Sequence, residues 1–177
     1  MALLNMVGAL NRALDEALRD DPRVVLLGQD IGQDEGVFRV TADLLKRYGE
    51  KRVVDTPLAE AAIVGGAIGM ALYGLTPVAE MQFSGFFYQG FHQVEQHVSR
   101  FRNRTRGRLP LPLVLRMPFG GGIRAIEHHS ESREAYYVHT PGLQMVVCSS
   151  PRNARALLLA SIRSPDPVIF FEPKAVY

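Results

Sequence analysis

The sequence predicts an α/β fold in which a parallel sheet is flanked by helices on both faces. Short apolar runs recur along the chain, and segments with helical periodicity separate them. Strands that alternate with helices and are apolar throughout belong to parallel sheets covered on both sides. The runs expected to form strands are residues 24–27, 53–54, 77–79, 113–115, 145–148 and 168–171.

Two helices can be placed from local signals. Leucine and alanine recur at helical spacing over residues 10–18, and Asp21-Pro22 ends that pattern before the first apolar run. Before the last apolar run, Ser150 suits the capping position and Pro151 the first helical position. Apolar residues then form one stripe over 154–162, so a helix should cross from one strand to the next there.

Length and composition indicate one globular domain over residues 1–177. The chain is 47% apolar, enough for a single core. With 20 basic and 18 acidic residues, its net charge of +2 creates no field that would favour nucleic acid or a membrane surface. Cys148 is the single cysteine, and the opening residues lack a basic leader followed by an apolar core. We therefore expect a cytoplasmic protein with no nucleic-acid partner.

The segment between Glu60 and Glu80 carries no charge and is long enough to span a bilayer. Several glycines dilute its apolarity, Leu75-Thr76-Pro77 interrupts it, and no basic flank marks a cytoplasmic side. A buried helix followed by a buried strand is the better interpretation, and no membrane association is expected.

Functional residues should lie in the loops that follow the strands. In open parallel sheets, ligands bind beyond the carboxyl ends of the strands. The loops of interest are residues 28–36, 55–60, 80–89 and 118–132.

Glu60 stands out because it opens an otherwise apolar helical segment. A carboxylate in the first helical turn complements the partial positive charge of the helix terminus, and this is the simpler interpretation. The alternative is a buried general acid or base, whose ionisation is opposed by desolvation and favoured by the helix dipole. Position alone does not decide between them.

The Gly120-Gly121-Gly122 run and the adjacent histidines suggest an active-site loop. Residues 120–125 fit the dinucleotide-binding pattern formally, but a polar, aperiodic stretch follows where that pattern needs a helix. A mobile glycine-rich loop is the better interpretation. His128 and His129 could serve a metal, a proton relay or only solvent, and a shared metal is disfavoured because adjacent side chains point in different directions.

Arginine alternates with other residues from Arg100 to Arg108. A nucleic-acid arm is one interpretation, but a solvated turn or a docking patch for an acidic partner fits better in a chain of balanced charge. Cys148 ends an apolar run and is expected in the core rather than as a nucleophile.

Taken in order, several segments closely resemble the beta subunit of pyruvate and branched-chain 2-oxo acid dehydrogenases. The matching segments are residues 25–32, 36–41, 55–60, 77–83, 120–122, 128–130 and 171–174. The resemblance implies a transketolase-like, pyrimidine-binding domain of the thiamin-diphosphate-binding fold. It covers only the amino-terminal domain of that family, so the family's carboxy-terminal domain is expected to be absent.

The resemblance also implies a site. Glu60 matches the glutamate that hydrogen-bonds the pyrimidine ring of thiamin diphosphate, and this favours the functional interpretation of Glu60 over the dipole one. His129 matches the histidine that faces the substrate and the lipoyl group. The remaining matched positions around the cofactor are Leu58 and Phe86, which pack on the pyrimidine, Gln89, which neighbours them, and Gln29, where the family usually has Glu.

Metals are implied in the same way. The family holds the cofactor's Mg²⁺ with a Gly-Asp-Gly motif of the alpha subunit, and this chain has no such motif. It would therefore supply half of an active site. A structural potassium site is matched, less closely because Ser164 replaces the more usual Asp. Its residues would be Leu113, Ser161, Ile162, Ser164 and Asp166.

The activity implied is oxidative decarboxylation of pyruvate or a branched-chain 2-oxo acid with acyl transfer to lipoamide. The expected partners are an alpha subunit, a second beta chain in a heterotetramer, and the lipoyl acyltransferase core of the complex. Two alternatives remain open at this point: the beta subunit of an acetoin dehydrogenase, and a truncated, non-catalytic binding module.

Overall fold

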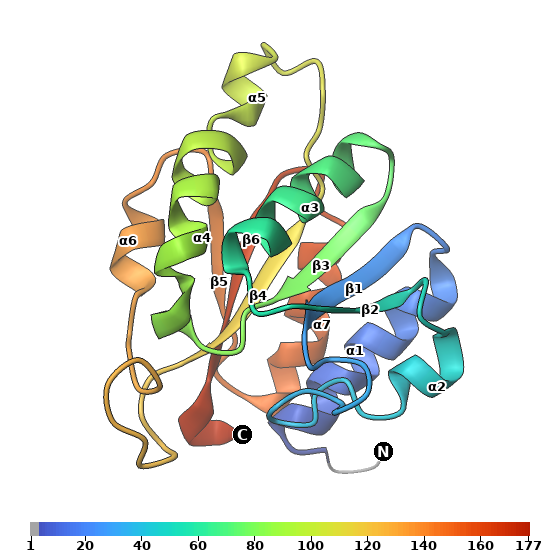
Figure 1. The fold of residues 1–177 in the computed structure, drawn as a ribbon, viewed down its shortest axis with the longest axis vertical. Coiled ribbons are helices and arrows are strands. Elements are labelled where there is room, and N and C mark those ends of the chain that lie inside the picture. Colours follow the sequence, from blue (N-terminus) through green and yellow to red (C-terminus); the bar gives the residue numbers. More distant parts are fainter. Residues whose placement is uncertain (1–3) are drawn as a thin grey trace.

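The computed structural model describes residues 4–177, so residues 1–3, part of the opening stretch that argued against a secretory leader, lie outside it. Within this range one six-stranded sheet has the strand order β2-β1-β3-β4-β6-β5, and every neighbouring pair is parallel. The predicted parallel sheet is confirmed (Figure 1). The strands are β1 (Val24–Gln29), β2 (Val53–Thr56), β3 (Thr76–Glu80), β4 (Val114–Phe119), β5 (Gln144–Val147) and β6 (Val168–Pro173).

Helices cover both faces of this sheet. One face carries α1 (Met6–Asp20), α2 (Leu44–Tyr48) and α7 (Pro151–Ile162) (Figure 1). The other carries α3 (Glu60–Leu72), α4 (Tyr88–Gln93) with its π-helical continuation η2 (Val94–Val98), and α6 (Glu134–Val138). The short helix α5 (Phe101–Arg104) stands at the tip of an arm that projects from the body, and 3-10 turns lie at η1 (Ser84–Phe87) and η3 (Lys174–Val176).

Alternate residues of each strand point into two separate hydrophobic cores, one beneath each helical layer. Leu26 packs with the α1 and α7 side chains, whereas Leu27 packs with those of α3 and α4. Phe170 and Phe171 divide in the same way. Because successive strand side chains point to opposite faces, an uninterrupted apolar run is the pattern that two covered faces require.

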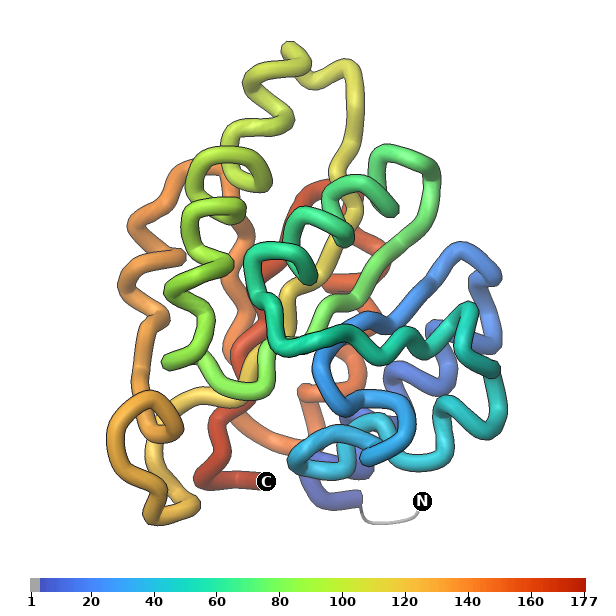
Figure 2. Tube along the Cα trace, in the orientation of Figure 1, coloured from blue at the N-terminus to red at the C-terminus, as the bar shows by residue number. Residues whose placement is uncertain are grey.

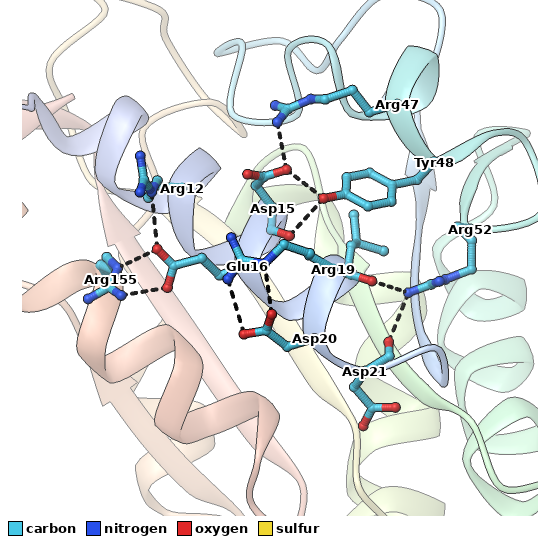
Figure 3. Close-up of polar contacts among 11 residues, drawn as sticks. Arg12, Asp15, Glu16, Arg19, Asp20, Asp21, Arg47, Tyr48, Arg52 and Arg155 are labelled. Carbon is cyan, nitrogen blue, oxygen red and sulfur yellow. Dashed lines mark hydrogen bonds and ion pairs between the residues drawn. The ribbon is translucent and has the colours of Figure 1, made fainter.

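The α1–α7 layer is fixed by caps and by one inter-helix carboxylate. Asn5 accepts a hydrogen bond from the Gly8 amide at 2.9 Å, and the Ser150 amide donates to Asn153 Oδ1 at 3.2 Å, which confirms the predicted start of α7. Glu16 on α1 receives hydrogen bonds from Arg155 of α7 and from Arg12 of its own helix (Figure 3).

Cys148 lies fully buried in this α1–α7 core, as predicted from its apolar surroundings. Burial raises the pKa of its thiol to about 12, so the thiolate that would act as a nucleophile is scarce near neutral pH.

Helix α3 is buried on one side only, whereas its apolar sequence predicted a buried helix. Ile63, Val64 and Ala67 face the core. A Cβ placed on Gly66 or Gly69 would meet no atom within 4 Å, because the glycine side of the helix has no neighbour within residues 4–177. None of the helices in this range has the length and apolarity needed to cross a bilayer.

The arginine-rich segment forms the projecting arm and makes local contacts. Arg100 pairs with Glu95 at 2.5 Å, Arg102 with Asp166 at 2.6 Å, and Arg104 donates to the Gln96 carbonyl at 2.9 Å. The balanced charge favoured a solvated turn or a docking patch for an acidic partner, and both stay predictions.

Candidate active site

A cavity of about 320 Å³ lies beyond the carboxyl ends of the strands, where the loops after β2, β3 and β4 converge. It brings together four of the residues that the resemblance singled out. Its lining consists of Leu58, Glu60, Gly85, Phe86, Tyr88, Gln89 and His128. This cavity therefore lies at the edge of the sheet where the general rule for parallel sheets places ligands.

Glu60 is the first residue of α3 and is only 7% exposed. Its Oε2 atom is buried and has no hydrogen-bond partner in the described part of the chain. A buried carboxylate oxygen that lacks a partner destabilises the fold by about 1–3 kcal/mol or more. The helix terminus favours the negative charge. Glu60 also lines the cavity, where a bound ligand would be close enough to the carboxyl group to supply the missing donor.

The rest of the lining is largely apolar. Phe86 is partly buried, while Leu58 is 63% exposed and stands where a ligand could cover it. Tyr88 is 51% exposed on the same side. An apolar wall beside one unpaired carboxylate is typical of a small-molecule site, in which a few polar groups fix the orientation of the ligand.

The two adjacent histidines point to different neighbours, as predicted. His128 lines the cavity and has a φ angle of +68°. His129 packs edge-on against the rings of Phe83 and Phe86, with centroid distances of 4.7 and 4.9 Å. Its Nδ1 lies 3.2 Å from the Glu127 carbonyl oxygen. A carbonyl only accepts, so Nδ1 carries the proton and Nε2 is left as the nitrogen that can exchange one.

Neighbouring elements tie down the loop that carries these histidines. The hydroxyl of Ser84 donates to the Glu131 carbonyl at 2.9 Å, and Lys174 Nζ donates to the His129 carbonyl at 2.7 Å. At Gly85 a Cβ would lie 2.1 Å from the His128 carbonyl oxygen, so only glycine permits this approach. Residues 120–132 form no helix, which confirms that 120–125 is not a dinucleotide-binding turn.

Gln29 is the last residue of β1 and is not among the residues that line the cavity. Gln29 pairs in register with Thr56 of β2. The loop after Gln29 is held by a side chain from the end of β2. The Asp55 carboxylate accepts hydrogen bonds from the Gly32 and Gln33 amides at 2.6 and 2.9 Å. The placement of Gln29 beside the cofactor stays a prediction.

A buried charge cluster on the α1–α7 side of the sheet was missed in the sequence. Arg116 of β4 donates to both oxygens of Glu172 at 2.7 Å and also pairs with Glu80, while Tyr177 donates to Glu172. Burial raises the pKa of Glu80, and Arg116 opposes that shift. A charged residue inside an apolar strand was the available signal, because such residues are almost never fully buried unless they are paired.

The residues matched to a potassium site lie near one another, away from the cavity. The Leu113 carbonyl accepts from the Val168 amide at 3.0 Å, and Ser161 lies in the last turn of α7, ahead of Ile162. The Ser164 hydroxyl donates to the Asp166 carbonyl at 2.9 Å. In residues 4–177 no group of three or more His, Cys, Asp or Glu side chains is arranged to hold a metal ion.

Two larger cavities are weaker candidates for the functional site than the carboxyl-end cavity. One of about 400 Å³ lies at the amino ends of β1 and β3, where Val24 and Thr76 line it. The other, of about 530 Å³, is an open groove between α1 and α7 whose central Glu16 is already paired with Arg12 and Arg155 (Figure 3). Glu60 provides the only unpaired buried carboxylate oxygen among the described residues, and it lies at the carboxyl-end cavity.

One known protein family matches this chain. The family model of the transketolase pyrimidine-binding domain matches residues 3–177. The chain belongs to this family. The expected fold and the resemblance stated above are thereby confirmed.

The curated relatives of this pyrimidine-binding domain are dehydrogenase beta subunits. It is 53% identical over its whole length to "Pyruvate dehydrogenase E1 component subunit beta" of Acholeplasma laidlawii, of which it covers 54%. It is 51% identical over 98% of its length to "3-methyl-2-oxobutanoate dehydrogenase subunit beta" of Mycobacterium tuberculosis, of which it covers 50%. The chain thus spans about half the length of these relatives.

A solved structure shares the fold. The chain described as "Split gene transketolase, inactive beta4 tetramer" superposes with a TM-score of 0.77 at 19% sequence identity. The match covers 98% of this chain and 52% of that one.

Proposed function

We propose that this domain supplies the pyrimidine-side half of a thiamin diphosphate site in the decarboxylating component of a 2-oxo acid dehydrogenase. The observation that carries the proposal is the unpaired, buried Oε2 of Glu60 at an apolar cavity. The relatives support it, because they are beta subunits of pyruvate and 3-methyl-2-oxobutanoate dehydrogenases. Substrates of the same kind, pyruvate or a branched-chain 2-oxo acid, are proposed here.

The residues present fit the pyrimidine of thiamin diphosphate. Glu60 would hold a ring nitrogen, and Leu58 and Phe86 would cover the ring faces, with Gln89 beside them. Gln29 would approach from the end of β1. The cofactor, when bound, would supply a nucleophilic carbon for addition to the oxo group of the substrate and would accept the electron pair left behind when carbon dioxide departs.

The residues of this chain would orient the bound cofactor and transfer protons. Glu60, which is only 7% exposed, would bind one ring nitrogen strongly, since hydrogen bonds to charged groups gain strength where solvent is excluded. His129 offers Nε2 to the substrate side, because its Nδ1 is committed to the Glu127 carbonyl. The aromatic rings of Phe83 and Phe86 keep the imidazole in place.

The proposal includes partners and ions. An alpha subunit would hold the diphosphate with Mg²⁺, a second beta chain would complete a heterotetramer, and a lipoyl acyltransferase core would receive the acyl group. The segment from Ser161 to Asp166 with Leu113 would hold K⁺ largely through carbonyl oxygens. A reducing compartment such as the cytoplasm suits a chain whose single cysteine is buried and free.

The test is Glu60→Gln in the complex reconstituted with an alpha subunit. Turnover should fall by a factor of about 100 or more, because a neutral amide cannot move the proton. Calorimetry should show weaker thiamin diphosphate binding, while the circular dichroism spectrum stays unchanged. The matched control is Glu50→Gln, an exposed carboxylate away from the cavity. If Glu60→Gln binds the cofactor and turns over as the parent does, the proposal is wrong.

A further inference from the structure

Lys174 is a buried lysine without a carboxylate partner in the described chain. It follows β6 directly, is 5% exposed, and takes part in none of the ion pairs of residues 4–177. Lysine is rarely buried so far unless it is paired, because transferring an ammonium group out of water is costly. An apolar side chain of similar length would fill the same space at lower cost.

The ammonium group makes two contacts. One is to the loop of residues 120–132, the histidine loop, and the other is to an aromatic ring that packs on this loop. Nζ donates to the His129 carbonyl oxygen at 2.7 Å and lies 5.3 Å from the centre of the Phe83 ring. The same Phe83 ring packs edge-on against the His129 imidazole. Figure 2 shows the loop, in yellow to orange, beside the red carboxy-terminal segment.

The backbone around Lys174 also contacts the start of this loop. A Cβ on Gly122, which has a φ angle of +127°, would lie 3.2 Å from the Lys174 carbonyl carbon and from the Ala175 amide nitrogen. The end of β6 therefore holds the loop near both of its ends, at Gly122 through close packing and at His129 through a charged donor. Lys174 itself does not line the cavity.

We propose that Lys174 is a positioning residue whose ammonium group fixes the backbone at His129 and so holds the imidazole toward the substrate. This inference rests on the proposed function, in which His129 faces the substrate. Charge-assisted hydrogen bonds are roughly twice as strong as neutral ones, so this single contact outweighs an ordinary loop hydrogen bond. Desolvation lowers the pKa of Lys174, and the hydrogen bond that its Nζ donates to the His129 carbonyl oxygen measures 2.7 Å.

The first test measures the loop itself in the full chain with Lys174→Met, which keeps the length of the side chain and removes the donor. Trypsin should cleave after Arg124, in the loop, about ten times faster than in the parent, as expected for loss of a hydrogen bond to a charged group. Cleavage after Arg106, on the distant arm, is the internal reference, and Lys51→Met at an exposed lysine is the matched control. An unchanged ratio of the two cleavage rates overturns the proposal.

A second measurement separates positioning from mere stabilisation. Nitrogen NMR of the labelled histidines should show His129 with its proton on Nδ1 in the parent and an averaged tautomer in Lys174→Met. The midpoint of urea unfolding should not fall, because methionine relieves the cost of a buried charge. A lower midpoint with an unchanged His129 spectrum would show a structural role only and would overturn the proposal.

Turnover in the reconstituted complex completes the test. Lys174→Met should lower kcat about tenfold, the lower range of losses for a misplaced acid–base group, with less change in the cofactor's affinity. Parent-like kcat in Lys174→Met, together with an inactive Glu60→Gln, overturns the Lys174 proposal alone. Activity retained in Glu60→Gln would instead overturn the proposed function, whatever the loop measurements show.

Discussion

Individual side chains in this protein show how burial and charge are reconciled. Arg116 lies between two nearly solvent-free carboxylates, Glu80 and Glu172, and Tyr177 adds a donor to the second. Burial acts to lower the pKa of Arg116, but attraction to Glu172 and Glu80 raises it above its usual value. Removing one member of such a cluster leaves an uncompensated buried charge, which typically costs about 3–5 kcal/mol. The cluster therefore links β3, β4 and β6 on the α1–α7 side of the sheet.

The hydrogen bonds of Glu16 should make the free energy of unfolding depend on pH (Figure 3). The hydrogen bond from Arg155 is the largest cause that holds the pKa of Glu16 below its usual value of 4.5. A lowered folded-state pKa contributes stability above the unfolded value, and that contribution is lost as pH falls through the folded one. Glu16→Gln should lower the free energy of unfolding by about 1 kcal/mol at pH 7, and the difference should shrink below pH 4.5.

Urea unfolding of Glu16→Gln and the parent at pH 7 and at pH 3.5 measures this difference. Asp20→Asn is the control, because its pair with Arg19 is exposed and lies within one helix end. Equal losses for Glu16→Gln at both pH values would contradict the assigned linkage.

Candidate site residues could be named in advance only where a family motif matched them, and two of these, Gln29 and His129, do not line the cavity. Glu60, Leu58, Phe86 and Gln89 follow from the resemblance, and the structure places them around one cavity. The same sequence did not indicate the role of Lys174. Its acceptor is a backbone carbonyl, and every residue has one, so no residue type marks the contact.

At the level of elements, the strands were predicted well because two covered faces leave a strong apolar pattern. The predicted runs all lie within or overlap the six strands. The short helices α2, α4 and α6 were not predicted. Each has few turns and draws its stability from packing rather than from sequence periodicity, as α4 shows by continuing into a π-helical turn at Val94–Val98.

The open glycine side of α3 leads to a prediction about assembly. Gly66 and Gly69 leave space for a close backbone approach by another chain, and Leu72 and Tyr73 are exposed nearby. Gly66→Leu or Gly69→Leu should block assembly with partner chains. Leucine favours helix over glycine by up to about 1 kcal/mol, so the isolated chain should unfold no more easily than the parent.

Native mass measurement reads the assembly, and thermal unfolding reads the fold. Ala160→Leu, on the exposed side of α7, is the matched control and should assemble normally. Intact oligomers in both glycine variants would mean that this side of α3 stays open to solvent.

As a whole molecule, the domain presents a site with one side open. Leu58 and Tyr88 are exposed at the cavity, and the sequence lacks the Gly-Asp-Gly motif that, in the proposed function, a partner subunit would supply for Mg²⁺. The sequence could indicate this incompleteness because a missing motif can be read directly. It could not indicate the shape of the open side, which depends on how far each loop rises above the sheet.

The isolated domain should therefore bind thiamin diphosphate and Mg²⁺ weakly, because it lacks ligands for the diphosphate. Calorimetric titration of the chain alone should give no submicromolar affinity, and addition of an alpha subunit should produce tight binding. Glu60→Gln with the alpha subunit serves as the control for specific binding. Tight binding by the chain alone would show that it holds a complete site.

The burial of Cys148 has a practical consequence for observing the molecule at work. A thiol with no exposed surface and a pKa raised to about 12 reacts slowly with maleimides and nitroxide reagents. The native cysteine would therefore take up little label. A cysteine introduced at Ile126, which is 82% exposed in the histidine loop, would carry the only reactive label. Fluorescence or electron spin resonance from that position would report loop motion during turnover, without any need to replace the native cysteine.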